Sequence, residues 1–267
     1  MKSTSASRTT GYRVHLFYNK LVLLAGLGFF LHCSAVAQLV ISPTTLELSQ
    51  TQKIAAVSVT MDSKALVPMR LQASVFSWRQ DSKGENVNEP TTELLVNPLI
   101  AEIKPGQKQI FRVALSGQRT VQEELAYRLV LEDISPAIAP AQGTNNLMID
   151  FRVRYDLPVL SAPIGPVINR LVWKPCASDS STSTKASEAC VHLLNTGNRR
   201  VKVQSLTIEG DTWQQTRDFG AGENILAGAE RELTISLKPG QSSSFRKVQV
   251  QTALGETLQI DPGNFSR

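Results

Sequence analysis

The sequence is poor in the side chains on which enzymes and metal sites most often depend. Its 267 residues include three histidines and three cysteines, and beyond residue 37 only His192, Cys176 and Cys190 remain. A zinc site needs three or four Cys, His or carboxylate ligands, and a Ser-His-Asp or Cys-His site needs a base beside its nucleophile. His192 lies in a short β-like run, where an ordinary sheet residue is the simpler interpretation. We therefore expect no catalytic site, no metal and no cofactor.

Other functional signatures are missing as well. There is no long amphipathic helix, no G-x-G-x-x-G segment and no phosphate-binding Gly-Lys-Thr loop. The formal charge of +5 belongs mostly to residues 1–37, which contain four basic residues and no acidic ones. The rest of the chain has 24 basic and 23 acidic residues. A charge this close to balance gives no support to nucleic-acid binding.

Residues 1–37 have the pattern of a signal peptide. Basic residues precede an apolar run over residues 21–31, and Ala35-Val36-Ala37 supplies the small residues of a cleavage site. The run is too short to span a bilayer as a permanent helix, and no other stretch comes close. We expect cleavage before Gln38, export, and no integral membrane segment in the mature chain.

Cys176 and Cys190 form an even pair in a chain that we expect to be exported. This predicts a disulfide, with two free thiols as the alternative that an oxidising compartment disfavours. Closing a loop of about fifteen residues stabilises a fold by about 3 kcal/mol in chain-entropy terms.

Two domains fit the mature length, with the boundary in the Pro- and Gly-containing stretch at residues 160–166. Both halves, 38–160 and 161–267, show short alternating apolar runs separated by turn residues, which predicts an all-β protein of two immunoglobulin-like β-sandwich domains. The predicted strands are 39–48, 54–61, 69–78, 94–96, 109–115, 126–134 and 147–160, then 169–173, 189–195, 201–209, 225–226, 231–237, 244–252 and 257–260. The turn sequence Lys-Pro-Gly-Gln occurs in each half, at 104–107 and 238–241.

The most regular alternation in the chain lies at residues 147–157. Apolar side chains fall on one face and charged ones on the other. An ordinary strand between a core and water has this pattern. A second interpretation is an exposed edge strand that presents its apolar row to another chain, which would take affinity from main-chain hydrogen bonds and register from side-chain pockets. The apolar row consists of Leu147, Ile149, Phe151, Val153, Tyr155 and Leu157.

Several short motifs in the first half, taken in order, resemble those of the periplasmic pilus (fimbrial) chaperones of chaperone-usher systems. The resemblance covers the first domain, while the second shares only position, β content and the cysteine pair. The motifs are residues 42–48, Phe76-Ser77-Trp78, Asn97-Pro98, 103–106, Phe111-Arg112-Val113, 126–134 and Leu157-Pro158-Val159.

This resemblance implies two immunoglobulin-like domains in a boomerang arrangement, working in the periplasm. Such a chaperone binds a pilus subunit that lacks a strand, completes it with its own last strand of the first domain, and delivers it to an outer-membrane usher. The implied donor face is Ile149, Phe151 and Val153, extended by Leu147 and Tyr155. The alternative is a secreted structural or adhesive immunoglobulin-like module whose edge strand pairs permanently within an assembly.

The sequence departs from the better-known family members at one place. Those carry an Arg on the first strand and a Lys at the end of the last, which grip the carboxylate at the client's C-terminus, whereas the corresponding positions here hold Thr45 and Pro158. The sequence is thus more similar to the archaic branch of the family. Our candidates for the missing carboxylate anchor are Arg128 and Arg112. For an ion pair that steadies the two domains, the candidates are Glu132 and Asp133.

Overall fold

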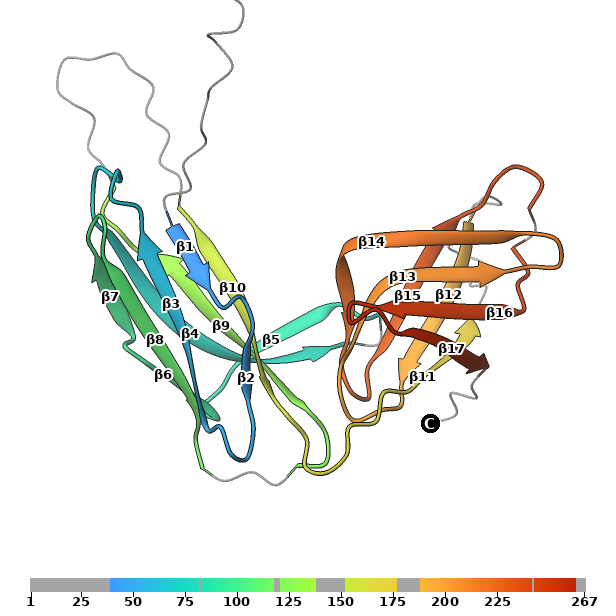
Figure 1. Cartoon of the computed structure of the whole chain (residues 1–267), viewed down its shortest axis with the longest axis horizontal. Coiled ribbons are helices and arrows are strands. Elements are labelled where there is room, and N and C mark those ends of the chain that lie inside the picture. The colour runs from blue at the N-terminus through green and yellow to red at the C-terminus, as the bar shows by residue number, and fades with distance from the viewer. Residues whose placement is uncertain are drawn as a thin grey trace, which may run out of the picture. The chain divides into compact units, whose positions relative to one another are not determined.

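The computed structural model describes residues 39–81, 83–117, 121–137, 152–176, 188–241 and 243–262, and these form only strands and their connections (Figure 1). The all-β prediction is confirmed. No helix in this part of the chain is long and apolar enough to cross a membrane. The predicted signal peptide lies outside the described residues.

The first sandwich is built from two sheets that share one core. One sheet has the strand order β1-β3-β8-β6, and the other has the order β2-β10-β9-β4-β5 with β7 also paired to β4. Val57 and Phe111 from the first sheet and Leu71 and Leu129 from the second are fully buried in that core. The strands are β1 (Leu39–Ser42), β2 (Leu46–Leu48), β3 (Ile54–Met61), β4 (Met69–Gln80), β5 (Asn86–Pro90), β6 (Leu94–Asn97), β7 (Ile100–Ile103), β8 (Lys108–Leu115), β9 (Leu125–Asp133) and β10 (Arg154–Ser161).

Two chain segments pass from one sheet of this sandwich to the other at a proline. The segment expected as one strand over 39–48 is interrupted at Pro43, so that β1 pairs with β3 while β2 pairs with β10. Pro98 separates β6 from β7 in the same way. Proline has no N–H to give to a ladder, which explains why each pairing stops there.

The second sandwich has the strand order β14-β13-β16-β17-β11-β12-β15. Its ladder folds over a core that includes Trp173, Val191, Val203 and Val250. β17 pairs antiparallel with β16 and parallel with β11, which joins the two layers. The strands are β11 (Leu171–Pro175), β12 (Glu188–Asn195), β13 (Val201–Glu209), β14 (Gln214–Ile225), β15 (Glu230–Ser236), β16 (Lys247–Thr252) and β17 (Thr257–Pro262). The predicted domain boundary at residues 160–166 begins with the last two residues of β10 and continues into the connection to β11.

The two Lys-Pro-Gly-Gln sequences form the same kind of turn in the two sandwiches. The backbone N–H of Gln107 donates to Lys104 O at 2.9 Å, and that of Gln241 donates to Lys238 O at 3.1 Å. Gly106 and Gly240 have φ values of 75° and 87°. Proline followed by a glycine with positive φ is typical of a type II turn.

Three strands were missed or cut short by the sequence pattern. β5 is polar and mostly exposed, and β7 is only four residues long. β14 was expected only at its last residue, because only one of its twelve residues is buried and it contains two glycines. These strands form because neighbouring strands provide backbone hydrogen-bond partners. They lack the apolar alternation by which a half-buried strand is predicted from sequence.

Candidate functional site

The strand β10 has a partner along only part of one side. On one side it pairs with β9 over its whole length, from Arg154 opposite Glu132 to Ser161 opposite Leu125. On the other side β2 pairs in parallel with residues 159–161 alone (Figure 1). Within the described part of the chain, residues 154–158 therefore have no strand on that side. Pro158, which has no N–H to donate, lies where an open edge tolerates it.

The predicted donor row divides at this strand. Leu157 and Val159 are buried in the core of the first sandwich, and Tyr155 is half-buried and packs against the same core. For these residues the ordinary interpretation of the alternation holds. Val153 is half-buried, and its carbonyl accepts a hydrogen bond from the backbone N–H of Asp133 at 2.9 Å. Leu147, Ile149 and Phe151 lie outside the described residues.

Arg128 is the most unusual charged residue near this edge. Its side chain is only 14% exposed, and its guanidinium carbon lies 3.6 Å from the centroid of the Trp78 ring. This is a close cation–π contact. Its Nη1 is 3.5 Å from Asp156 Oδ1, and its Nε is buried without a hydrogen-bond partner. Burial lowers the pKa of the Arg128 guanidinium, and the Asp156 charge only partly opposes this.

The register places Arg128 next to Pro158 and level with Thr45, the two positions at which the resemblance would place the cleft cations. Arg128 lies directly opposite Pro158 in the β9–β10 pair. Thr45 comes just before Leu46, which pairs with Val159. Arg128 thus projects from the strand next to the one that carries Pro158, on the outer face of the sheet.

Arg112, the other candidate anchor, is not part of this cluster. It lies on β8, opposite Ala56 and Asn97, and its side chain is exposed. That strand belongs to the other sheet of the sandwich. Sequence reasoning missed Trp78 and Asp156 as neighbours of Arg128, although alternation places Arg128 on the outer face, where even-numbered residues of β10 also point.

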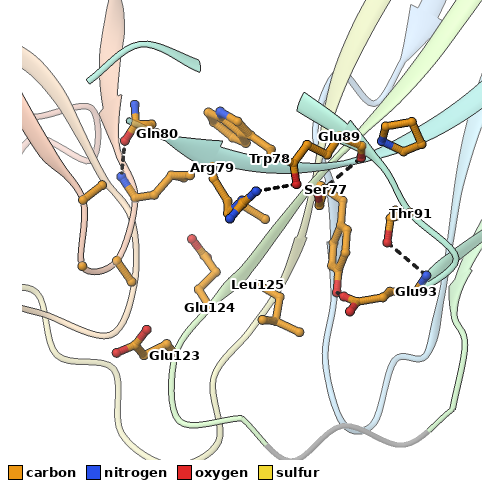
Figure 2. Close-up of a pocket in the computed structure, with 17 residues that line it drawn as sticks. Ser77, Trp78, Arg79, Gln80, Glu89, Thr91, Glu93, Glu123, Glu124 and Leu125 are labelled. Atoms are coloured by element: carbon orange, nitrogen blue, oxygen red, sulfur yellow. Dashed lines mark hydrogen bonds and ion pairs between the residues drawn. The ribbon is translucent and has the colours of Figure 1, made fainter. Parts of the chain in front are cut away.

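A cleft of about 690 Å³ lies beside this cluster, lined mostly by β4, β5 and β9 and by residues 226–229. Polar side chains of the cleft pair with one another: Figure 2 shows Arg79 paired with Glu89. The Tyr127 hydroxyl donates a hydrogen bond to Glu93 Oε2 at 2.9 Å. Among the described residues that line it there is no histidine and no cysteine. Its lining thus provides none of the usual nucleophile–base pairs.

The comparisons with known proteins identify the first sandwich. Residues 38–166 match the family model for the pili and flagellar-assembly chaperone, PapD N-terminal domain. The first sandwich therefore belongs to the pilus-chaperone family. This family is not enzymatic, so the chaperone is not an enzyme. No curated protein sequence matches the chain.

Solved structures share the fold over both sandwiches of this chaperone. A chain of the CsuC–CsuE chaperone–tip adhesion subunit pre-assembly complex, from the archaic chaperone-usher Csu pili of Acinetobacter baumannii, aligns with TM-score 0.61 and 18% identity over 85% of this chain and 100% of that chain. A chain from the Salmonella enterica SafA pilin–SafB chaperone complex gives 0.53 and 15%, over 84% and 95%. The E. coli chaperone DraB gives 0.52 and 15%, over 83% and 94%. The predicted fold of two immunoglobulin-like domains is confirmed.

Ion pairs join the two sandwiches of the chaperone at Glu124. Its side chain is 3% exposed, and Oε2 lies 2.7 Å from Arg200 Nη1 and 3.5 Å from Arg199 Nε. The backbone N–H of Arg200 donates to Oε1 at 3.1 Å. Burial raises the pKa of the Glu124 carboxyl, and the charges of Arg200 and Arg199 oppose this only in part.

The prediction that Glu132 or Asp133 makes such an ion pair was wrong. Asp133 accepts a hydrogen bond from the backbone N–H of Ser135 at 2.8 Å inside the first sandwich, and Glu132 is exposed. Both lie at the end of β9, whereas Glu124 directly precedes its start. A strand of nine residues separates the two ends by roughly 30 Å, so Glu124 reaches the second sandwich and the far end of β9 does not.

The chaperone has the predicted disulfide between Cys176 and Cys190, with the two Cα atoms 5.5 Å apart. These sulfur atoms and the Glu232 carboxylate are close enough together to suggest a metal site. Both sulfurs are committed to the disulfide, so neither is a thiolate ligand. His192 is a sheet residue on β12, as expected, and its Nε2 lies 2.8 Å from Glu230 Oε2.

Proposed function

We propose that this protein is a periplasmic chaperone that binds pilus subunits by donor-strand complementation and delivers them to an outer-membrane usher. The observation that carries the proposal is the unpaired side of β10 over residues 154–158. The chain that enters this edge contains the alternating apolar row Leu147, Ile149, Phe151 and Val153. A free backbone edge continued by alternate apolar side chains is what strand addition to another protein requires.

The burial of side chains along β10 indicates which apolar residues are available to a client. Leu157 and Val159 belong to the chaperone's own core, so they stay with the first sandwich. We infer that Leu147, Ile149, Phe151 and Val153 enter the groove of the client, and that Tyr155 is the residue at which the row passes from one core to the other. Burying each large apolar side chain contributes about 1.5–3 kcal/mol, so a few anchors suffice without a nucleotide.

Known complexes support the choice of client. The similar structures include a chaperone with a tip adhesion subunit and a chaperone with a pilin. A subunit that lacks a strand exposes apolar surface and unpaired backbone, which makes it prone to aggregate until another strand covers it. Work in the periplasm, reached through the signal peptide at residues 1–37 with cleavage before Gln38, agrees with the disulfide.

We also propose that Arg128 binds the carboxylate at the client's C-terminus. Arg128 is a poorly paired cation beside the free edge of β10. A guanidinium binds a carboxylate best through two parallel hydrogen bonds. Arg112 has the right chemistry, but it is exposed on the other sheet, which makes it the weaker candidate.

Co-expression with the pilin-like proteins encoded beside this gene tests the function. We expect the wild-type chaperone to purify in a one-to-one complex with a subunit. Phe151→Asp should abolish the complex, because a charge cannot enter an apolar groove. The matched control is Leu254→Asp, which puts the same charge on an 80% exposed leucine of the second sandwich. Capture at normal yield by Phe151→Asp would refute the donor-strand assignment.

A second experiment tests turnover. The purified complex is challenged with a peptide that corresponds to the N-terminal extension of another subunit. We expect the chaperone to be released, because a better-fitting strand replaces the donated segment at residues 147–153. Retention of the subunit under this challenge would point instead to permanent pairing within a structural assembly.

A further inference from the structure

Asp156 pairs with Arg128, the residue that we propose as the partner of the client's C-terminal carboxylate. It lies two residues before Pro158 on β10, on the same outer face as Arg128. Its Oδ1 is 3.5 Å from Arg128 Nη1, and no other ionic partner of Arg128 lies in the described part of the chain. The Asp156 side chain is 38% exposed, so it can turn toward water without leaving a buried charge behind.

The pairing between these two residues is incomplete. A guanidinium offers five N–H groups, and a strong pair with a carboxylate has two hydrogen bonds near 2.8 Å. Here one long contact reaches Nη1, while Nε is buried without a partner. The Trp78 ring lies under the guanidinium carbon, with the ring centroid 3.6 Å away, and a ring face is no substitute for a carboxylate that accepts two N–H groups. Arg128 therefore keeps an unused capacity for a carboxylate that approaches in the guanidinium plane.

The position of Arg128 at the end of the free edge favours the C-terminal carboxylate of a polypeptide as its ligand. Arg128 is level with Pro158, at one end of the unpaired stretch of β10. Beyond it, β2 takes over as the neighbour of β10 at Val159. A client strand that pairs with residues 154–158 therefore has to stop beside Arg128, where a terminal carboxylate is within reach of the guanidinium.

We propose that Asp156 is a built-in substitute for the client's C-terminal carboxylate, and that the client displaces it from Arg128 on binding. This inference rests on the proposed function. Asp156 keeps the buried cation partly neutralised in the free chaperone, and it yields to a carboxylate with better geometry. Asp156 also makes binding selective. A client whose terminal carboxylate does not reach Arg128 gains no ion pair in return for displacing Asp156.

The test uses the full chaperone co-expressed with its subunit in two forms, one with the native C-terminus and one extended by Gly-Ser-Gly-Ser, which moves the carboxylate away. Release of subunit is followed after a challenge with the extension peptide. We expect Asp156→Asn to slow release of the native subunit about fivefold, the factor that corresponds to the loss of one competing exposed ion pair. Release of the extended subunit should not change.

Two further variants complete the design. Asp211→Asn removes an equivalent exposed carboxylate in the second sandwich, and it should leave both release rates unchanged. Arg128→Ala should make native and extended subunits leave at the same rate. If Asp156 only positions Arg128, Asp156→Asn speeds release of the native subunit, which overturns the inference. Unchanged release overturns it too.

The outcomes separate this inference from the proposed function. If the wild-type chaperone captures no subunit, the proposed function fails and the inference fails with it. If it captures native and extended subunits equally well, donor-strand binding stands while Arg128 and Asp156 have no role in recognising the chain end.

Discussion

Arg231 on β15 donates a hydrogen bond from Nη1 to the backbone oxygen of Gly84 at 2.6 Å. Gly84 lies in the turn between β4 and β5, so this contact ties that hairpin of the first sandwich to the second. Gln80 adds to it by accepting from the backbone N–H of Leu226 at 2.9 Å and donating to Asn224 O at 2.8 Å. The hairpin therefore contributes to holding the second sandwich.

Gly84→Ala should destabilise the chaperone more than a comparable glycine substitution. Gly84 has φ +82°, and an added Cβ would lie 2.7 Å from Arg231 Cγ and 3.1 Å from its Cα. In Gly240→Ala only the left-handed backbone is strained, because nothing lies within 4 Å of its Cβ. We expect about 1 kcal/mol for Gly240→Ala and about 2 kcal/mol or more for Gly84→Ala. Urea unfolding measures both, and equal losses would contradict the close approach.

Glu124→Gln should change how stability depends on pH. Burial raises the pKa of Glu124, so the folded chain binds the proton more tightly than the unfolded chain. The contribution of this group is therefore greatest below its unfolded pKa and falls as pH rises through the folded pKa. We expect the stability of the wild type relative to Glu124→Gln to fall as the pH rises above the ordinary pKa of a glutamate, about 4.

The control for that measurement is Glu89→Gln, which removes a carboxylate whose side chain is 54% exposed. Its removal should change the stability by less than about 1 kcal/mol, because an exposed ion pair contributes little. Thermal unfolding at several pH values gives both differences. An increasing advantage of the wild type over Glu124→Gln with rising pH would show that its ion pairs outweigh burial.

Asn195→Ala should be strongly destabilising, because this side chain is fully buried and satisfies three backbone groups. Its Nδ2 donates to Arg199 O at 2.8 Å and to Ile225 O at 3.0 Å, and its Oδ1 accepts from Gly197 N at 2.9 Å. Each orphaned buried group costs about 1–3 kcal/mol, so we expect a loss of about 3 kcal/mol or more. Asn88→Ala, at an exposed site, should stay within about 0.5 kcal/mol of the wild type. Chemical unfolding distinguishes the two.

Removing the disulfide should cost about 3 kcal/mol in the stability of the second sandwich. The double substitution Cys176→Ser and Cys190→Ser and reduction of the wild type should have the same effect, because both open the loop that spans a sequence separation of 14. The measurement is urea unfolding with and without reductant. A reductant effect on the double variant would mean that the loss does not come from this bond.

Buried apolar alternation explains which parts of the fold the sequence predicted. The strands at 54–61 and 201–209 have the predicted bounds. Buried side chains alternate along the whole of the first, and along the second they alternate on either side of a bulge between Val203 and Ser205. β5 and β14 have few buried side chains, so their strand character depends on β4 and β13 as partners rather than on their own residues. Pairings between distant segments are set by tertiary structure, which local pattern does not encode.

The sequence predicted Arg128 as a candidate carboxylate anchor, but it did not predict the residues that contact Arg128. The motif that resembles the pilus chaperones brought attention to Arg128, and the absent cleft cations at Thr45 and Pro158 gave the reason to look for a substitute. Its contacts with Trp78 and Asp156 depend on the register between β9 and its two neighbours. Sequence spacing gives the face on which a residue lies, but not the offset between strands.

The crossings at Pro43 and Pro98 have a consequence for how the first sandwich comes apart. Each crossing makes one continuous piece of chain an edge member of both layers. Peeling one layer away therefore pulls on strands of the other, and the two layers are expected to lose amide protection against hydrogen exchange together as a single cooperative unit. The first sandwich can therefore present the unpaired side of β10 to another chain while its two sheets stay packed together.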